Sequence, residues 1–316
     1  MIAHLLIAAA CLTTAAEATL SLSDFRIRDP FVLPVPEEGA YYLYGTSMHL
    51  PAATGFDAYT STDLKTWKGP IPVFRPEQGF WATGSYWAPE VYAYKGRYYM
   101  FATFHSKERN RGTQVLVADK PSGPFRVHSD GPVTPKEWLC LDGTLFVDDA
   151  QQPWMVFCHE WLQVKDGEIC AVKLSPELDR AIDKPVLLFK ATDAKWVVET
   201  GDTKHKGFVT DGPFLHRAKS GALWMLWSSF GEGGYKTALA ISDSGSLLGP
   251  WKQCEKPIFE DDGGHAMLFT SFDGTLLMSL HRPNRHPDER AIILKATETD
   301  GTLILTPMPD PTPSAR

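Results

Sequence analysis

The chain has 316 residues, 43% hydrophobic and 22% charged, which is typical of a globular protein with a large core and argues against disorder. Its formal charge of −7 comes without any Lys/Arg cluster along the chain, which argues against a nucleic-acid partner because phosphate binding requires a concentrated basic face. The length would allow about two domains of roughly 150 residues, but propellers often use it as one unit. We therefore expect a single domain over residues 19–316.

The first eighteen residues differ from the rest of the chain. Residues 5–12 are apolar, and small residues then lead to Ala18, a pattern typical of an export signal. The apolar run is too short to span a bilayer as a permanent helix. The sequence thus predicts a periplasmic or secreted protein with no membrane span, and the alternative is a lipid anchor on Cys11.

Four cysteines remain after residue 18: Cys140, Cys158, Cys170 and Cys254. None has the C-x-x-C spacing of a zinc site. A disulfide in an oxidising compartment and buried free thiols both stay open.

A hairpin pattern recurs five times along the mature chain. Each copy is an apolar run, a tight turn that carries Gly or Asp, and a second run rich in Tyr, Trp, Phe and Met. The copies pair residues 29–33 with 40–45, 88–94 with 97–101, 142–147 with 153–157, 211–215 with 222–227, and 265–269 with 275–280.

Further strands are expected between these hairpins, for example at residues 114–118 and 236–241. Each unit then holds about four antiparallel strands with a period of roughly fifty to sixty residues, as in a propeller blade. No stretch sustains apolar positions at helical spacing. The predicted fold is all-β, a five-bladed β-propeller. A β-sandwich, the alternative, does not account for five copies of one hairpin opening.

Chemistry-bearing residues stand at or near the start of the first run of every copy. In a propeller these first strands line the central channel, so their starts converge. The residues are Asp29, Glu90, Asp142, Asp211 and His265. Converging carboxylates raise one another's pKa, which marks a functional site, and a pair of them is what glycosidic cleavage requires. A single Asp-Gly pair, in contrast, is as often a turn.

These residues stand in motifs whose order resembles glycoside hydrolase family 43. The motifs are Arg28-Asp29-Pro30, Trp87-Ala88-Pro89-Glu90-Val91, Leu141-Asp142-Gly143, Asp211-Gly212-Pro213 and Gly264-His265. The resemblance implies a five-bladed propeller that cleaves arabinose or xylose polymers, in some members galactose, with inversion at the anomeric carbon.

The resemblance also implies roles for individual residues. Asp29 corresponds to the general base, Asp142 to the carboxylate that adjusts and orients the acid, and Trp87 to an aromatic wall. His265 corresponds to a histidine near a channel ion, calcium or another, although a hydrogen-bonded core histidine is an equal alternative. No cofactor is required.

The general acid is where the sequence departs from the family. The family has Glu-Gly-Pro, whereas this chain has Asp211-Gly212-Pro213, and Asp is one methylene shorter. Glu160 is the preferred substitute, because the end of a return strand lies beside the start of the outgoing one, next to Asp142. A neighbouring carboxylate and the ring of Trp161 would raise its pKa. Asp211 is the alternative acid, and Glu199 is a third.

Other residues follow second strands that return to the funnel, or open a first strand, and are predicted to contact the sugar. They are Trp87, Glu90, Trp161, Trp227, Phe230, His281 and Arg282.

The predicted function is an inverting, exo-acting glycoside hydrolase that removes terminal sugars, above all α-L-arabinofuranosyl, from plant-type polysaccharides or oligosaccharides. A β-xylosidase or galactofuranosidase of the same family is one alternative, and a carbohydrate-binding propeller without activity is another. A monomer is assumed.

Overall fold

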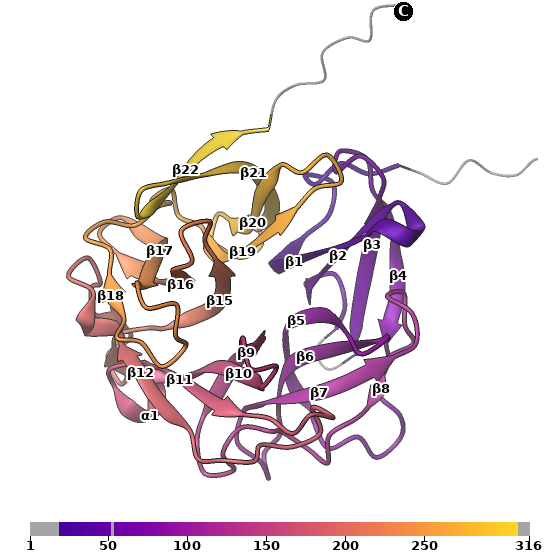
Figure 1. The fold of residues 1–316 in the computed structure, drawn as a ribbon. Helices are drawn as coiled ribbons and strands as arrows, with labels where there is room; N and C mark the ends of the chain where they lie inside the picture. Colours follow the sequence, from indigo (N-terminus) through magenta and orange to yellow (C-terminus); the bar gives the residue numbers. More distant parts are fainter. Residues whose placement is uncertain (1–18, 52–53, 309–316) are drawn as a thin grey trace, which may run out of the picture.

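The computed structural model describes residues 19–51 and 54–308. They form five four-stranded antiparallel sheets arranged in a ring around a central axis (Figure 1). The fold is the predicted five-bladed β-propeller with four strands per blade. The predicted export signal and Cys11 lie outside the described residues.

Each blade is one contiguous stretch of chain, and its strands pair in sequence order. Blade 1 holds β1 (Ile27–Val35), β2 (Ala40–Ser47), β3 (Phe56–Ser61) and β4 (Lys68–Phe74); blade 2 holds β5 (Gly84–Tyr94), β6 (Arg97–His105), β7 (Gly112–Ala118) and β8 (Arg126–Val127); blade 3 holds β9 (Cys140–Val147), β10 (Pro153–His159), β11 (Glu168–Lys173) and β12 (Val186–Lys190). Blade 4 holds β15 (Asp211–Arg217), β16 (Leu223–Gly231), β17 (Gly234–Ser242) and β18 (Lys252–Gln253); blade 5 holds β19 (Gly264–Thr270), β20 (Leu276–Arg282), β21 (Arg290–Thr299) and β22 (Thr302–Pro307).

Little else is regular in the described part of the chain. A two-stranded hairpin of β13 (Thr200–Gly201) and β14 (Lys206–Gly207) lies in the loop before blade 4. One α-helical turn, α1 (Trp161–Val164), follows β10, and two 3₁₀ turns cover Pro36–Glu38 and Ala191–Asp193. No helix among the described residues is long and apolar enough to cross a membrane.

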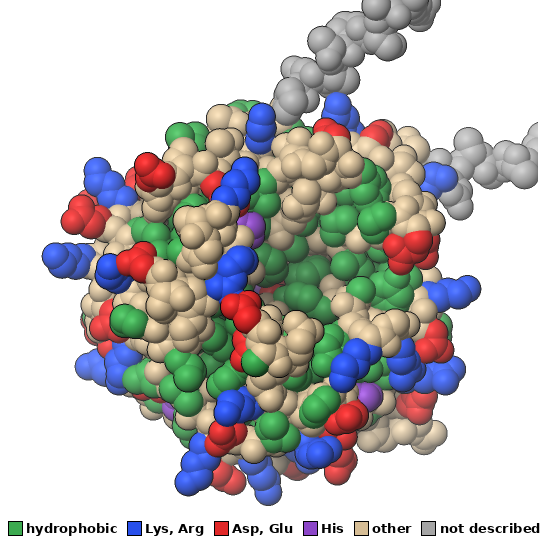
Figure 2. Space-filling view, in the orientation of Figure 1, with side chains coloured by type: hydrophobic (Ala, Val, Ile, Leu, Met, Phe, Trp, Pro, Cys, Tyr) green, Lys and Arg blue, Asp and Glu red, His purple; other side chains and the backbone are tan. Residues whose placement is uncertain are grey.

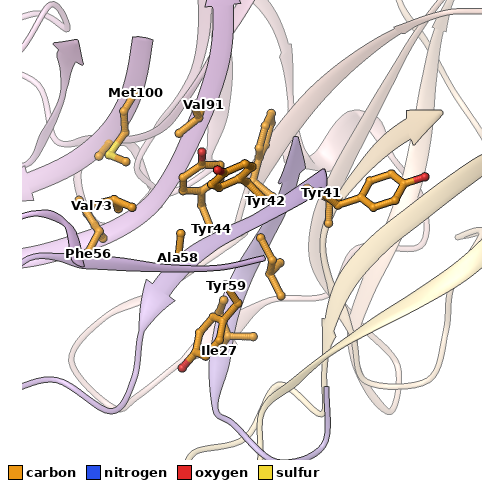
Figure 3. Close-up of a cluster of buried hydrophobic side chains, with 14 of the residues drawn as sticks. Ile27, Tyr41, Tyr42, Tyr44, Phe56, Ala58, Tyr59, Val73, Val91 and Met100 are labelled. Carbon is orange, nitrogen blue, oxygen red and sulfur yellow. The ribbon is translucent and has the colours of Figure 1, made fainter. Parts of the chain in front are cut away.

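The core lies between neighbouring blades and is rich in aromatic side chains. In blade 1 the second strand contributes Tyr42, Leu43 and Tyr44, which are at most 6% exposed. Figure 3 shows Tyr42 and Tyr44 beside Val91 and Met100 of blade 2, so this cluster joins two blades. The wide aromatic residues at these positions fill the space that opens between sheets as they splay outward from the axis.

All four cysteines after residue 18 are free thiols. Cys140, Cys158 and Cys170 are buried in blade 3, where burial raises the pKa of each thiol. They serve as small hydrophobic residues of the core.

The first strand of each blade carries a residue in the left-handed backbone region close to its start, and β5 carries a second one, Ser85 (φ 52°). The residues that recur in the five blades are Asp29 (φ 52°), Ala88 (φ 44°), Asp142 (φ 56°), Gly212 (φ 52°) and His265 (φ 54°). The pairing register shifts around each of them, which marks a β-bulge. A bulge redirects side chains away from the regular pleat, and left-handed non-glycine residues concentrate at functional sites. The repeated bulge turns side chains toward the axis.

Candidate active site

The five bulges surround a cavity of about 360 Å³ on the propeller axis. Its walls come from all five blades: Arg28, Asp29, Thr46, Met48, Trp87, Leu141, Asp142, Asp211, Tyr235, His265, His286 and Glu289. In the space-filling view, the ring is hollowed at its centre, and hydrophobic and charged side chains border the hollow (Figure 2).

The bulges supply wall residues from two backbone positions, which form two groups. The first group is the left-handed residues Asp29, Asp142 and His265. The second group is the residues just before a left-handed position: Arg28, Trp87, Leu141 and Asp211. Asp211 therefore occupies a different place in its blade from Asp29. In blade 4 the left-handed position is Gly212, where a Cβ atom would lie 2.8 Å from Cγ of His265, so a side chain there would clash with the His265 ring.

Asp29 is held as a carboxylate. The Thr46 hydroxyl donates to its Oδ2 at 2.6 Å, and Nδ1 of His265 and Nδ1 of His281 lie 3.3 and 3.6 Å from its Oδ1. Burial alone would raise the pKa of Asp29, but the charges of His265 and Arg28, together with the Thr46 hydrogen bond, lower it below its usual value. Asp29 is thus ionised near neutral pH and can accept a proton.

His281 supports Asp29 from behind. Its Nδ1 accepts a hydrogen bond from the Asp29 backbone N–H at 3.3 Å, and its Nε2 lies 3.2 Å from Oδ1 of Asn284. Burial is the main cause that lowers the pKa of His281, to about 4. A neutral imidazole therefore fixes the position of Asp29 without adding a charge.

Asp142 is a buried carboxyl group whose titration is coupled to that of its carboxyl neighbours. Burial first, and then the charge of Asp29, raise its pKa to about 8. Its Oδ2 accepts a hydrogen bond from the Gly212 N–H at 3.0 Å and lies 3.7 Å from Nδ1 of His265. Asp142 is thereby linked both to the base side of the cavity and to the segment that carries Asp211.

Asp211 lies across the same cavity. The Tyr235 hydroxyl donates to its Oδ2 at 2.9 Å. Burial, followed by the charge of Asp142, raises the pKa of Asp211 to about 7. Asp211 is therefore a carboxyl group with a proton to give in the pH range where Asp29 is ionised.

Glu160 lies beside blade 3 as the hairpin geometry predicts, because its N–H donates to the Leu139 carbonyl at 2.8 Å, just ahead of Asp142. Its carboxylate, however, forms an ion pair with Arg111. The Arg111 guanidinium lies over the Trp87 ring, 4.5 Å from its centroid. Glu160 is buried and does not line the cavity, although its charge is among those that raise the pKa of Asp142.

The remaining predicted contact residues lie in several places. Trp87 lines the cavity and is 38% exposed. Glu90 lies two residues beyond the left-handed position, is buried, and accepts a 2.5 Å hydrogen bond from the Tyr92 hydroxyl; burial raises its pKa to about 7. His281 touches Asp29 rather than the cavity.

The other four residues do not line the cavity. Trp227 is fully buried, with its ring 5.1 Å from that of Trp196. Phe230 packs on Tyr235 at 5.3 Å, and Arg282 pairs with Asp261. Trp161 begins α1 beside Gly207. Glu199, the third acid candidate, is exposed in the loop before blade 4.

Sequence reasoning missed part of the wall. Tyr235 lies on the third strand of its blade, and His286 and Glu289 lie in the loop after β20. None of them belongs to the repeated hairpin opening, so the repeat carried no signal for them.

The hypothesis of a channel ion at His265 stays a prediction. Its Nε2 is buried and has no hydrogen-bond partner within the described residues. No group of three or more His, Cys, Asp or Glu that could hold a metal was found among those residues. Calcium takes six to eight oxygen ligands, so one histidine nitrogen alone fits it poorly.

Glycoside hydrolases use two carboxyl groups beside the bond that they cleave, one ionised and one protonated. The cavity on the propeller axis is bordered by such a pair, Asp29 and Asp211. The chain belongs to the glycosyl hydrolases family 43, whose model matches residues 22–303.

Two relatives and one solved structure illustrate the likeness. The chain is 24% identical over 262 residues to the extracellular exo-α-(1→5)-L-arabinofuranosidase ArbA of Cellvibrio japonicus. The aligned region covers 77% of this chain and 71% of that protein. It is 22% identical over 189 residues to the extracellular endo-α-(1→5)-L-arabinanase 1 of Bacillus subtilis, covering 53% and 57%. The crystal structure of an endo-arabinase from Bacteroides thetaiotaomicron superposes with a TM-score of 0.85 at 42% identity, covering 90% of this chain and 98% of that one.

Proposed function

We propose that the protein hydrolyses α-L-arabinofuranosyl linkages with inversion at the anomeric carbon, using Asp29 as general base and Asp211 as general acid. One observation carries this proposal: the pKa of Asp29 is lowered and that of Asp211 is raised to about 7, on walls of one cavity. Two carboxyl groups whose surroundings separate their pKa values are suited to opposite roles in proton transfer.

As water attacks the anomeric carbon, Asp29 takes a proton from that water. The Thr46 hydrogen bond occupies Oδ2 of Asp29, which leaves Oδ1 to receive the proton. His265, 3.3 Å from Oδ1, and the neutral His281 orient the carboxylate.

In the same step Asp211 gives its proton to the departing glycosidic oxygen. We propose Asp211 in place of the preferred sequence candidate Glu160, because Asp211 lines the cavity whereas Glu160 is tied to Arg111. The shorter aspartate is backed by Tyr235. Asp142 raises the pKa of Asp211 and holds the Gly212 N–H next to it, as expected of a group that tunes and orients the acid.

The arabinose specificity rests on the relatives. An exo-α-(1→5)-L-arabinofuranosidase, an endo-α-(1→5)-L-arabinanase and a 42% identical endo-arabinase are among them. We propose removal of terminal residues, because a cavity of about 360 Å³ lies at the low end of ordinary ligand sites and suits a short sugar segment. Internal cleavage is the second candidate, favoured by the 42% identical endo-arabinase.

The site of action is proposed to be outside the cytoplasm. The export pattern of residues 1–18 agrees with the word extracellular in the names of two relatives. Expression of the full chain followed by N-terminal sequencing of the exported protein tests this, and we expect cleavage after Ala18.

An assay with aryl glycosides tests the activity. The purified protein is offered aryl α-L-arabinofuranoside, β-D-xyloside and β-D-galactofuranoside, and then linear 1,5-arabinan. We expect release from the arabinofuranoside and free arabinose as the early product from arabinan. If oligosaccharides appear early instead, the enzyme cleaves internal linkages and the proposed exo action is wrong. If only the xyloside or the galactofuranoside is hydrolysed, the proposed arabinose specificity is wrong. Sugar binding without any release would leave a carbohydrate-binding propeller.

A further inference from the structure

One buried carboxylate in the cavity wall has no part in the acid–base pair. Glu289 lies in the loop that follows β20, and only 1% of its side chain is exposed, yet it lines the cavity. Arg28 and His286 flank it on the same wall.

The contacts of Glu289 leave one oxygen without a hydrogen bond. Its Oε2 accepts a hydrogen bond from Arg26 at 3.5 Å. Its Oε1 lies 3.6 Å from Nη1 of Arg28 and 3.6 Å from Nδ1 of His286, and it accepts no hydrogen bond from the described part of the protein. The guanidinium groups of Arg26 and Arg28 therefore balance the charge of Glu289 without donating a hydrogen bond to this oxygen.

Arg28 is oriented by a different partner. Its Nη2 donates to Oδ1 of Asn284 at 2.8 Å, which fixes the plane of the guanidinium. Nη1 then lies near Oε1 of Glu289 at the cavity wall, one residue before Asp29 in the chain.

An unsatisfied buried carboxylate oxygen is costly, and native proteins rarely retain one without a reason. A ligand that brings a hydroxyl donor would satisfy Oε1. A sugar also offers a neighbouring hydroxyl oxygen that can accept from a guanidinium.

We propose that Glu289 and Arg28 form a recognition pair for two adjacent hydroxyl groups of the sugar whose glycosidic bond is cleaved. Oε1 of Glu289 accepts a hydrogen bond from one hydroxyl, and Nη1 of Arg28 donates to the oxygen of the next. The pair sets which glycosyl group can sit beside Asp29. This inference rests on the proposed function, which places a sugar in the cavity.

The rival explanation is a structural one, in which Glu289 only balances the charges of Arg26 and Arg28. A structural role would weaken turnover of every substrate equally. Recognition of a hydroxyl would instead make the loss depend on whether the substrate carries that hydroxyl.

Singly deoxygenated substrates separate the two explanations. The series is built on whichever aryl glycoside the wild-type protein hydrolyses, with each ring or exocyclic hydroxyl replaced in turn by hydrogen. We expect kcat/KM of the wild type to fall roughly 10- to 100-fold for at least one analogue, since a hydrogen bond to a charged group is lost. The Glu289→Ala variant should hydrolyse the parent substrate with a kcat/KM that is lower than the wild-type value by a similar factor. For this variant, removing the same hydroxyl from the substrate should lower kcat/KM little further.

Two further variants keep the test decisive. Glu289→Gln retains an acceptor oxygen and should recover part of the activity lost in Glu289→Ala. The control is Glu298→Gln, because Glu298 is another largely buried glutamate of blade 5 that pairs with a histidine, His216, at 2.9 Å but does not line the cavity. It should keep the full wild-type pattern.

The inference fails if Glu289→Ala, or Glu289→Gln where the alanine variant does not fold, retains every deoxygenation penalty of the wild type. It also fails if its parent activity is unchanged. Hydrolysis of the parent glycoside by the wild type reports on the proposed function separately, and absence of all hydrolysis would overturn both.

Discussion

At the scale of single residues, a backbone feature decides which carboxylates meet. Asp29 and Asp142 are left-handed residues of their bulges, whereas Asp211 directly precedes one. This offset, together with the Gly212 N–H that binds Asp142, brings Asp211 against Asp142, so that the charge of one raises the pKa of the other. The local chain geometry thereby produces the separated pKa values on which the proposed mechanism depends.

Replacing Asp211 by Asn should remove the proton donor while keeping the shape of the side chain. We expect turnover of natural arabino-oligosaccharides to fall about 10²- to 10⁴-fold, with aryl arabinofuranosides of good leaving groups largely spared because they need little protonation. Steady-state kinetics on both substrate types measures this. Glu160→Gln is the matched control and should not show this selective loss. If it did, and Asp211→Asn did not, Glu160 would be the acid.

The pH dependence follows from the same groups. Asp29 has a lowered pKa and stays ionised through neutral pH, whereas Asp211, with a pKa of about 7, must be protonated. We therefore expect kcat/KM to hold in mildly acidic solution and to fall as the pH rises through about 7. Because Asp142 titrates nearby, at about 8, the alkaline limb belongs to the coupled pair. A pH–rate profile that is flat to pH 9 would contradict these assignments.

At this scale the sequence predicted the residues that the repeated hairpin marks. Of the five residues at the hairpin openings, Asp29, Asp142, Asp211 and His265 line the cavity, as does Trp87, whereas Glu90 is buried and does not line it. The sequence also predicted that Glu160 lies near Asp142. It could not predict the ion pair between Glu160 and Arg111, which lies in the loop between β6 and β7 of the neighbouring blade. Such a pairing depends on how two sheets pack side by side.

At the scale of elements, strand alternation decides against which neighbouring blade a side chain packs. Trp227 ends the predicted return run of blade 4, and sequence placed it in the sugar pocket. In the structure its indole packs between blades against Phe189 and Trp196, and its N–H donates to Gln253 at 3.1 Å. Successive residues of a strand face opposite sides: Trp227 belongs to a core cluster shared with blade 3, whereas Leu226 belongs to one shared with blade 5. Both faces of this strand are therefore core, which a single sequence does not show.

Trp227 should therefore matter for stability rather than for sugar binding. We expect Trp227→Ala to lower the free energy of unfolding by about 3–5 kcal/mol, the usual cost of removing a large buried aromatic ring. Urea denaturation followed by circular dichroism measures this. KM of the folded variant at low temperature should stay near the wild-type value. A large rise in KM with unchanged stability would mean that Trp227 contributes to sugar binding.

At the scale of the whole molecule, the ring closes through side chains. Blade 1 and blade 5 are each built from one stretch of chain, and they do not share a sheet. Tyr41 of blade 1 stacks on Phe272 at 4.2 Å, and its hydroxyl accepts the Phe272 N–H at 2.8 Å. The Ser279 hydroxyl donates to the Pro30 carbonyl at 2.8 Å. Contacts of this kind join the first and last blades.

Substitutions of Tyr41 should separate the two parts of this closure. Tyr41→Phe removes only the acceptor for the Phe272 N–H and should cost about 1 kcal/mol. Tyr41→Ala also removes the ring and should cost about 3–5 kcal/mol. Thermal or urea unfolding measures both, with kcat unchanged below the transition because Tyr41 does not line the cavity. Equal losses in the two variants would mean that the ring packing contributes nothing.

The whole fold was predictable because its repeat is strong. All five predicted hairpins are the first two strands of a blade. The outermost strands could not be predicted in the same way. β8 and β18 have two residues each, too few to show alternation, and each is paired with the third strand of its blade. The loops that carry His286 and Glu289 follow no repeat and needed the structure.

The anomeric configuration of the first product tests the central claim most directly. Proton NMR recorded in the first minutes of hydrolysis of an aryl α-L-arabinofuranoside distinguishes the two anomers before they equilibrate. If Asp29 activates water on the face opposite the departing group that Asp211 protonates, β-L-arabinofuranose accumulates first. Initial release of the α-anomer would require a covalent intermediate and would contradict the assignment of Asp29 and Asp211 as base and acid.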